Sequence, residues 1–156
     1  MSVPAATLPA VRPTLPQAVA EARAAGATVE WGRLPDGVRG TYHHPTRTIT
    51  LAEGMSDTLA VPTLMHETLH AIRGDDGPQP AHVERRIDEA VARRLLTVAE
   101  YAAAEQVTGA RGSGALAVEL GVPRWVAAAF RRTLRTTAAR TAPHSTPSIP
   151  TERTHP

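Results

Sequence analysis

The 156-residue sequence contains no cysteine and no lysine, and aromatic residues make up only 3% of it. The absence of cysteine excludes disulfide bonds, cysteine-ligated zinc and cysteine nucleophiles. Alanine and valine dominate the apolar residues, so we expect a helix-rich core built from small side chains. All 17 basic residues are arginine, which we attribute to the coding bias of a GC-rich genome rather than to function.

The sequence also has no long apolar run. No window approaches the roughly 18–20 apolar residues that span a bilayer. The N-terminal residues MSVPAATLPAVRPTLP lack the charged segment and following apolar segment of a signal peptide. We therefore expect a cytoplasmic protein with no membrane partner.

Net charge is small, at +2, but it is unevenly distributed. Residues 106–156 carry seven arginines against two glutamates, a balance of +5. Residues 1–105 carry ten arginines against thirteen acidic residues, a balance of −3. The basic character thus belongs to the C-terminal third, the region where contacts with phosphate groups would be sought.

The length of the chain allows one modest hydrophobic core, so we expect one domain. Residues 1–16 hold four prolines and no periodic pattern, and are predicted to form a flexible arm. The proline-rich residues 141–156 are predicted to form a disordered tail. The single domain is expected to span residues 17–140.

Apolar periodicity and turn residues predict both strands and helices. Strands are expected within residues 27–34, 37–42 and 46–52, and helices over residues 17–27, 57–73, 82–104, 113–120 and 123–137. Asp57 is the expected N-cap of the second helix, although that helix could instead start at Pro62, since proline is tolerated in a first turn. A break is expected near Thr97, and GDDGPQP, 74–80, reads as a loop.

The second predicted helix carries the sequence His66-Glu67-Thr68-Leu69-His70. Histidines at i and i+4 project from one helix face, so that both can reach one ion at ~2.0–2.1 Å. Zinc lowers the pKa of a neighbouring water toward ~7, and the adjacent Glu67 can accept its proton as a general base. This HExxH pattern is typical of zinc-dependent hydrolases.

The context of the motif favours a metal site over a solvent-facing helix. Leu64, Met65, Leu69 and Ile72 make the helix apolar, which predicts that it is buried. A buried helix does not carry two histidines and a glutamate without partners.

A third protein ligand is expected from the next predicted helix. Glu84 and Asp88 share one face at i, i+4, so Glu84 could bind the metal while Asp88 orients a histidine. Glu89 lies about 100° further round the helix and is an alternative third ligand. Either acid could instead be a solvated partner of nearby arginines such as Arg85 and Arg93.

Three segments together resemble the ImmA/IrrE family of zinc metallopeptidase-like domains: TRTITLAEGM, the helix bearing HETLH, and VERRIDEAVARRLL. The resemblance covers residues 38–101 and is closest to small actinobacterial and phage members. Alignment on ARRLLT, 92–97, implies Glu84 as the third ligand and puts Asp88 where the family has an asparagine or acid. Thr97 and Val98 stand where a proline is usual, and the loop before Glu84 is short, which keeps Glu89 as the alternative.

The resemblance implies an α+β, gluzincin-like fold. In it a small three-stranded sheet packs on the HExxH helix, a second helix crosses behind, and residues 113–137 form a helical extension. It also implies a zinc-dependent metallopeptidase that hydrolyses a peptide bond in a partner protein, since family members cleave, or promote removal of, helix-turn-helix repressors. A zinc-stabilised module that binds a repressor without cutting it is an alternative.

Two further features bear on function. Tyr42, in the second predicted strand, is a candidate oxyanion stabiliser near the expected cleft. Residues 115–134 have a helix-turn-helix outline with several arginines, which makes DNA binding a second alternative. We favour instead a helical cap that packs apolar residues of this segment on the domain: Leu116, Leu120, Trp125, Val126 and Phe130.

Overall fold

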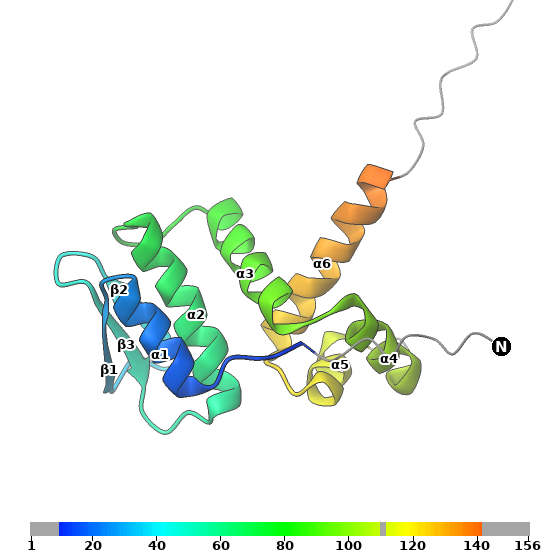
Figure 1. Ribbon diagram of the computed structural model, residues 1–156, viewed down its shortest axis with the longest axis horizontal. Helices are drawn as coiled ribbons and strands as arrows, with labels where there is room; N and C mark the ends of the chain where they lie inside the picture. The colour runs from blue at the N-terminus through cyan, green and yellow to red at the C-terminus, as the bar shows by residue number, and fades with distance from the viewer. Residues whose placement is uncertain (1–9, 110–111, 142–156) are drawn as a thin grey trace, which may run out of the picture.

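The computed structural model describes residues 10–109 and 112–141 and confirms the α+β class. Figure 1 shows the strands and the first two helices at one end of the molecule and the last three helices at the other. In chain order the elements are α1 (Leu15–Ala24), β1 (Thr28–Gly32), β2 (Gly40–His43), β3 (Thr48–Ala52), α2 (Asp57–Arg73), α3 (Ala81–Leu95), α4 (Val98–Thr108), α5 (Ser113–Leu120) and α6 (Arg124–Thr141).

The three strands form a mixed sheet in the order β1-β3-β2. β1 runs parallel to β3, and β2 runs antiparallel to it. Ile49 and Leu51 of β3 are fully buried, whereas the alternating Thr48 and Thr50 are only half-buried. One face of the sheet therefore packs on helices, and β2 is left as an edge strand.

α2 is the central helix of the sheet-containing end and is buried along most of its length. It begins at Asp57, with Ser56 as the N-cap, so the expected N-cap at Asp57 is wrong by one residue and the alternative start at Pro62 is wrong. Pro62 lies inside the helix, where its ring costs one backbone hydrogen bond. The expected burial of Ile72 is also wrong, since 63% of that residue is exposed.

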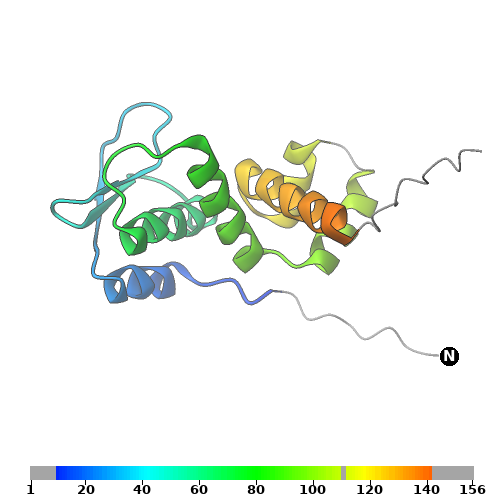
Figure 2. The same ribbon diagram turned by 90° about the horizontal axis from the view of Figure 1, so that it is seen from above.

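The predicted break near Thr97 is present, since α3 ends at Leu95 and α4 begins at Val98. Leu96 has extended backbone angles, and Thr97 starts α4 with a capping box in which Glu100 is the reciprocal partner. The chain turns there, and seen from above α6 runs beside α3 (Figure 2). The expected helices at 113–120 and 123–137 correspond to α5 and α6.

The C-terminal helices pack into the rest of the molecule as a cap. Leu116, Val126 and Phe130 are buried, and they belong to the same apolar cluster as Leu64 and Ile49. Within the described ranges, no helix is long and apolar enough to cross a membrane.

The N-terminal segment is partly described. Arg12 donates hydrogen bonds to the carbonyl oxygens of Leu95 and Leu120, and α1 begins at Leu15, two residues earlier than expected. The last residues of the predicted arm therefore hold a defined position. Residues 1–9, and the predicted tail beyond Thr141, lie outside the described residues.

Candidate metal centre

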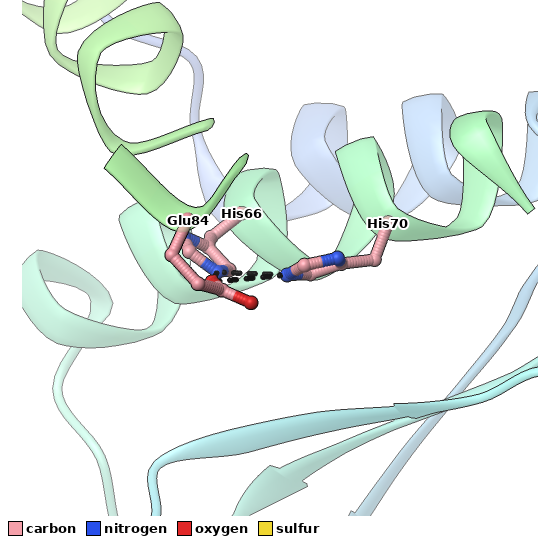
Figure 3. A group of neighbouring side chains, drawn as sticks. All are labelled: His66, His70 and Glu84. Carbon is pink, nitrogen blue, oxygen red and sulfur yellow. Dashed lines mark hydrogen bonds and ion pairs between the residues drawn. The ribbon is translucent and has the colours of Figure 1, made fainter. Parts of the chain in front are cut away.

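Two histidines from α2 and a glutamate from the first turn of α3 converge on one point (Figure 3). His66 Nε2 lies 3.0 Å from His70 Nε2 and 3.2 Å from Glu84 Oε2. His70 Nε2 lies 3.5 Å from the same oxygen. The i, i+4 spacing on α2 and the crossing of α3 thus bring three donor atoms together.

The size of this triangle fits a metal ion. Ligand atoms about 2.0–2.1 Å from a tetrahedral ion lie about 3.3 Å from one another. The three observed separations scatter around that value. The cluster of His66, His70 and Glu84 can therefore hold a metal ion, and three protein ligands leave a fourth tetrahedral position open.

Each histidine is oriented through its other ring nitrogen. His66 Nδ1 lies 3.2 Å from Asp88 Oδ1, and His70 Nδ1 lies 2.9 Å from Asp75 Oδ2. Because an ionised carboxylate only accepts hydrogen bonds, each Nδ1 must carry the proton that it donates. With neutral imidazoles, both Nε2 lone pairs then face the centre together with a Glu84 oxygen, an arrangement that a metal ion or a proton at the centre would stabilise. Carboxylate–histidine pairs of this kind orient metal ligands.

Electrostatics around His66 also favour positive charge. Burial lowers the pKa of this imidazole, but the hydrogen bond to Asp88 and the charges of nearby carboxylates outweigh burial, so the pKa is raised above its ordinary value. The centre therefore attracts a cation, or a proton in its place. A metal ion would compete with that proton, since a histidine ligand must be deprotonated.

Asp75 is absent from the candidates that the sequence pattern offers. It lies just after α2, where Gly74 adopts a left-handed conformation with φ 70° and turns the chain back over the last helical turn. Burial raises the Asp75 pKa, but hydrogen bonds from Arg73 and His70 outweigh it, and the pKa is lowered. The one sequence signal was the glycine that ends the helix, since such a cap returns the next residues toward the preceding turn.

Of the two alternative third ligands, Glu84 lies at the centre and Glu89 does not. The Glu89 carboxylate lies 3.5 Å from Arg93 Nη2 and 3.5 Å from Arg132 Nε, on the side of α3 that faces α6. Asp88, one turn after Glu84, contacts His66 as predicted from the i, i+4 spacing of the two acids.

Glu67 lies beside the ligands in a half-buried position. Burial raises the pKa of its carboxyl group and the negative Glu84 adds to the rise, whereas His66, His70 and the Tyr42 backbone N–H oppose it; the net pKa is raised. A carboxylate whose pKa is moved toward neutrality is suited to accept and return a proton.

β2 approaches this part of α2 unusually closely. A Cβ added at Gly40 would lie 2.6 Å from Thr63 Cγ2, which is too close for any side chain. Glycine therefore lets the strand lie against the helix, and this brings the backbone of Tyr42 to Glu67. The Tyr42 hydroxyl contacts His44 Nδ1 at 3.3 Å, so the candidate oxyanion stabiliser lies in the cleft wall with its hydroxyl directed at that histidine.

Two adjoining hollows meet at the candidate centre, and both are lined by Gly40, His66 and Glu67. One, of about 290 Å³, extends past Tyr42, Asp75, Gly77, Pro78 and Glu84. The other, of about 330 Å³, extends past Val38, Arg39, Thr63, Asp88 and Trp125. Both hollows thus border the candidate centre, and together they form the cleft between β2, α2 and α3.

The chain matches no protein-family model, and no curated protein or solved structure is significantly similar to it. Fold and site together define a small α+β domain with a candidate metal centre of two histidines and one glutamate. What this centre does is inferred from its geometry.

Proposed function

We propose that the protein is a zinc-dependent metallopeptidase of the ImmA/IrrE type that hydrolyses a peptide bond in a partner protein. The observation that carries the proposal is the convergence of His66 Nε2, His70 Nε2 and Glu84 Oε2, with separations of 3.0–3.5 Å, directly beside Glu67. Zinc, when bound, supplies a Lewis acid that makes water a nucleophile near neutral pH.

Residues of the chain supply proton transfer, orientation of the imidazoles and stabilisation of the oxyanion. Glu67 accepts the proton of the attacking water and then donates it to the leaving amine, a role that its raised pKa supports. Asp88 and Asp75 hold the two imidazoles in the tautomer that leaves Nε2 free. Tyr42, in the cleft wall, is the candidate for stabilising the oxyanion.

The edge strand supports a peptide as the substrate. The Ala52 N–H donates to Arg39 O, and the register makes alternate β2 residues bond to β3. Gly40 and Tyr42 therefore direct their backbone groups away from β3, along the cleft that contains Glu67; the Tyr42 N–H donates to Glu67, and the Gly40 N–H and the two carbonyl oxygens remain for a bound peptide. An extended peptide can pair with such an edge and pass the centre. The resemblance to ImmA/IrrE suggests a DNA-binding repressor as the partner.

The alternative of DNA binding through α5 and α6 is less well supported. Arg131 Nε donates to the Tyr101 hydroxyl at 2.9 Å, and Arg124 Nε donates to Ser113 Oγ at 3.3 Å. Arg132 faces the acidic residues of α3. Three arginines of α6 thus have partners within the chain, which makes them less available for contact with a phosphate backbone.

Metal binding is tested first, by zinc titration of the wild-type protein beside His66→Ala, with His82→Ala as a control at an exposed histidine of α3. We expect one zinc per chain in the wild type and in the control, and loss of binding in His66→Ala. Equal binding in all three would contradict the proposed centre.

Catalysis is tested by Glu67→Gln with a fluorescence-quenched library of mixed-sequence peptides. The variant is expected to keep zinc and lose cleavage, because Gln cannot accept the proton. Zinc binding without cleavage by the wild type, or cleavage that persists in Glu67→Gln, would contradict the peptidase. The first of these results would favour the non-catalytic module that binds a repressor.

A further inference from the structure

α6 brings two side chains to the candidate metal centre, although it is separated from α2 by three other helices in the sequence. The Trp125 ring meets the His66 ring edge-on, with centroids 5.9 Å apart and an interplanar angle of 84°. Two turns further along α6, Arg132 faces α3 at Asp88 and Glu89. The C-terminal third therefore touches the ligand His66 directly and also through Asp88.

The two oxygens of Asp88 have different partners. Oδ1 lies 3.2 Å from His66 Nδ1, and Oδ2 lies 3.5 Å from Arg132 Nη2. A carboxylate bound at one oxygen only can rotate about its Cβ–Cγ bond, whereas one bound at both cannot do so freely. The charge of Arg132 thus restrains the Asp88 carboxylate, which in turn orients the His66 imidazole.

Glu89 holds Arg132 in place from the neighbouring position on α3. Arg132 Nε lies 3.5 Å from Glu89 Oε1, so the Nε–Nη2 edge of the guanidinium faces both acids at once. Both nitrogens are buried, and neither has a hydrogen-bond partner at closer range. The Arg132 side chain is half-buried, and its inner edge is stabilised by this pair of carboxylates; removing it would leave two negative charges poorly compensated.

We propose that Arg132 is a positioning residue of the metal centre and that α6 is an integral part of that centre. Arg132 acts through Asp88 on His66, while Trp125 limits rotation of the same imidazole. The inference rests on the proposed metal site. It gives the basic C-terminal helix a role in metal affinity that does not depend on nucleic acid.

The test compares zinc affinity, measured by chelator competition, in the full-length wild type, Arg132→Gln and Arg135→Gln. Arg135 is the matched control because it lies one turn further along the same helix and is exposed. Loss of a group that orients a histidine ligand typically weakens metal binding about 10–100-fold. We expect a loss in that range for Arg132→Gln and wild-type affinity for Arg135→Gln.

A double-mutant cycle with Asp88→Asn separates positioning from general loosening of the fold. If Arg132 acts through Asp88, Arg132→Gln has little further effect in the Asp88→Asn background. An equal loss in both backgrounds, or wild-type affinity in Arg132→Gln, would overturn the proposal. Absence of zinc binding by the wild type would instead refute the metal site itself.

Circular dichroism in the presence of chelator tests whether Arg132→Gln is folded. If the variant is unfolded, Arg132→Lys takes its place, because lysine keeps the charge that the two acids require but cannot face both of them with a planar edge. A several-fold loss of affinity that is absent in the Asp88→Asn background is expected. Wild-type affinity in Arg132→Lys would then overturn the proposal.

Discussion

At the scale of single residues, the position of Glu67 favours proton transfer but disfavours the charged form of its carboxyl group. Its position beside the ligands suits proton transfer, but burial of the carboxyl group disfavours its charged form and raises its pKa. A raised pKa in the folded state favours folding below the unfolded pKa of about 4.3. That contribution is lost as the pH rises through the folded pKa.

We therefore predict that Glu67→Gln stabilises the metal-free protein at pH 8 and that this advantage disappears near pH 4. Glutamine has the same shape and can still accept the Tyr42 N–H, so charge is the main difference. Urea unfolding across this pH range, in the presence of chelator, measures the effect. Glu53→Gln, at an exposed glutamate, is the control. Parallel pH profiles for the wild type and Glu67→Gln would contradict the burial argument.

Residue identities at the candidate centre were predictable where spacing along a helix determines them. His66 and His70 lie one turn apart on α2, so 3.6-residue geometry alone brings both imidazoles to one face, and Glu67 directly follows His66. Asp75 was not predictable in this way, because its position depends on the left-handed Gly74. Ile72 was misjudged because burial depends on which neighbour covers a face, and no described element covers it.

At the scale of elements, the α3–α4 junction joins the metal-bearing part to the C-terminal helices. Glu100 accepts hydrogen bonds there from the Thr97 N–H and hydroxyl, each at 2.8 Å, and Arg12 lies 3.8 Å away. Burial raises the Glu100 pKa. The two hydrogen bonds from Thr97, a further hydrogen bond from the Ala10 N–H and the charge of Arg12 together outweigh burial, so the pKa is lowered. A lowered pKa contributes stability above the unfolded value, and this is lost as the pH falls through the folded pKa.

Glu100→Gln is accordingly predicted to destabilise the protein by about 1 kcal/mol at pH 7, because the charge-assisted hydrogen bonds become neutral ones. The difference from wild type should shrink as the pH falls below the unfolded pKa of about 4.3, and it should vanish once the pH is below the lowered folded pKa, where Glu100 is also uncharged. Chemical denaturation at pH 7 and pH 3.5 checks this, with Glu105→Gln, later in α4, as the control. A difference that does not depend on pH would show that the charge of Glu100 is unimportant.

Element boundaries were largely predictable, whereas the strand order was not. Thr97, Gly121 and Pro123 are local signals, and α4, α5 and α6 start or end beside them. β1 pairs with β3 and not with β2, the next strand in the chain, and this pairing depends on contacts between distant segments. Gly40 shows the same limit, because the sequence marks it as a turn or strand glycine but not as the point where β2 meets α2.

At the scale of the whole molecule, the candidate centre joins elements from most of the chain. α2 and α3 supply the three candidate ligands, the loop after α2 supplies Asp75, β2 approaches Glu67, and α6 supplies Trp125 and Arg132. These elements also share one buried apolar cluster. An ion bound at the centre would therefore stabilise the folded chain as a whole, because the unfolded chain cannot assemble the same ligands.

This linkage gives a prediction for metal removal. At a free zinc concentration 100 times the dissociation constant, binding adds about 2.7 kcal/mol to the free energy of unfolding. For a domain of about this size, 1 kcal/mol corresponds to roughly 2–4 °C in Tm, so chelation should lower Tm by about 5–10 °C. Calorimetry of the same sample before and after chelator, then after zinc is returned, measures the shift and its reversal.

The variants and a second ion decide where the zinc acts. His66→Ala and Glu84→Ala should show no zinc-dependent shift, since each removes a candidate ligand, whereas Glu67→Gln should keep it. Mg²⁺ prefers oxygen ligands in octahedral geometry and should not replace zinc at two imidazoles and one carboxylate. A zinc shift that persists in His66→Ala would place the ion elsewhere on the protein. If Mg²⁺ gave the same shift as zinc, the stabilisation would come from general screening of the carboxylates and not from coordination by the two histidines.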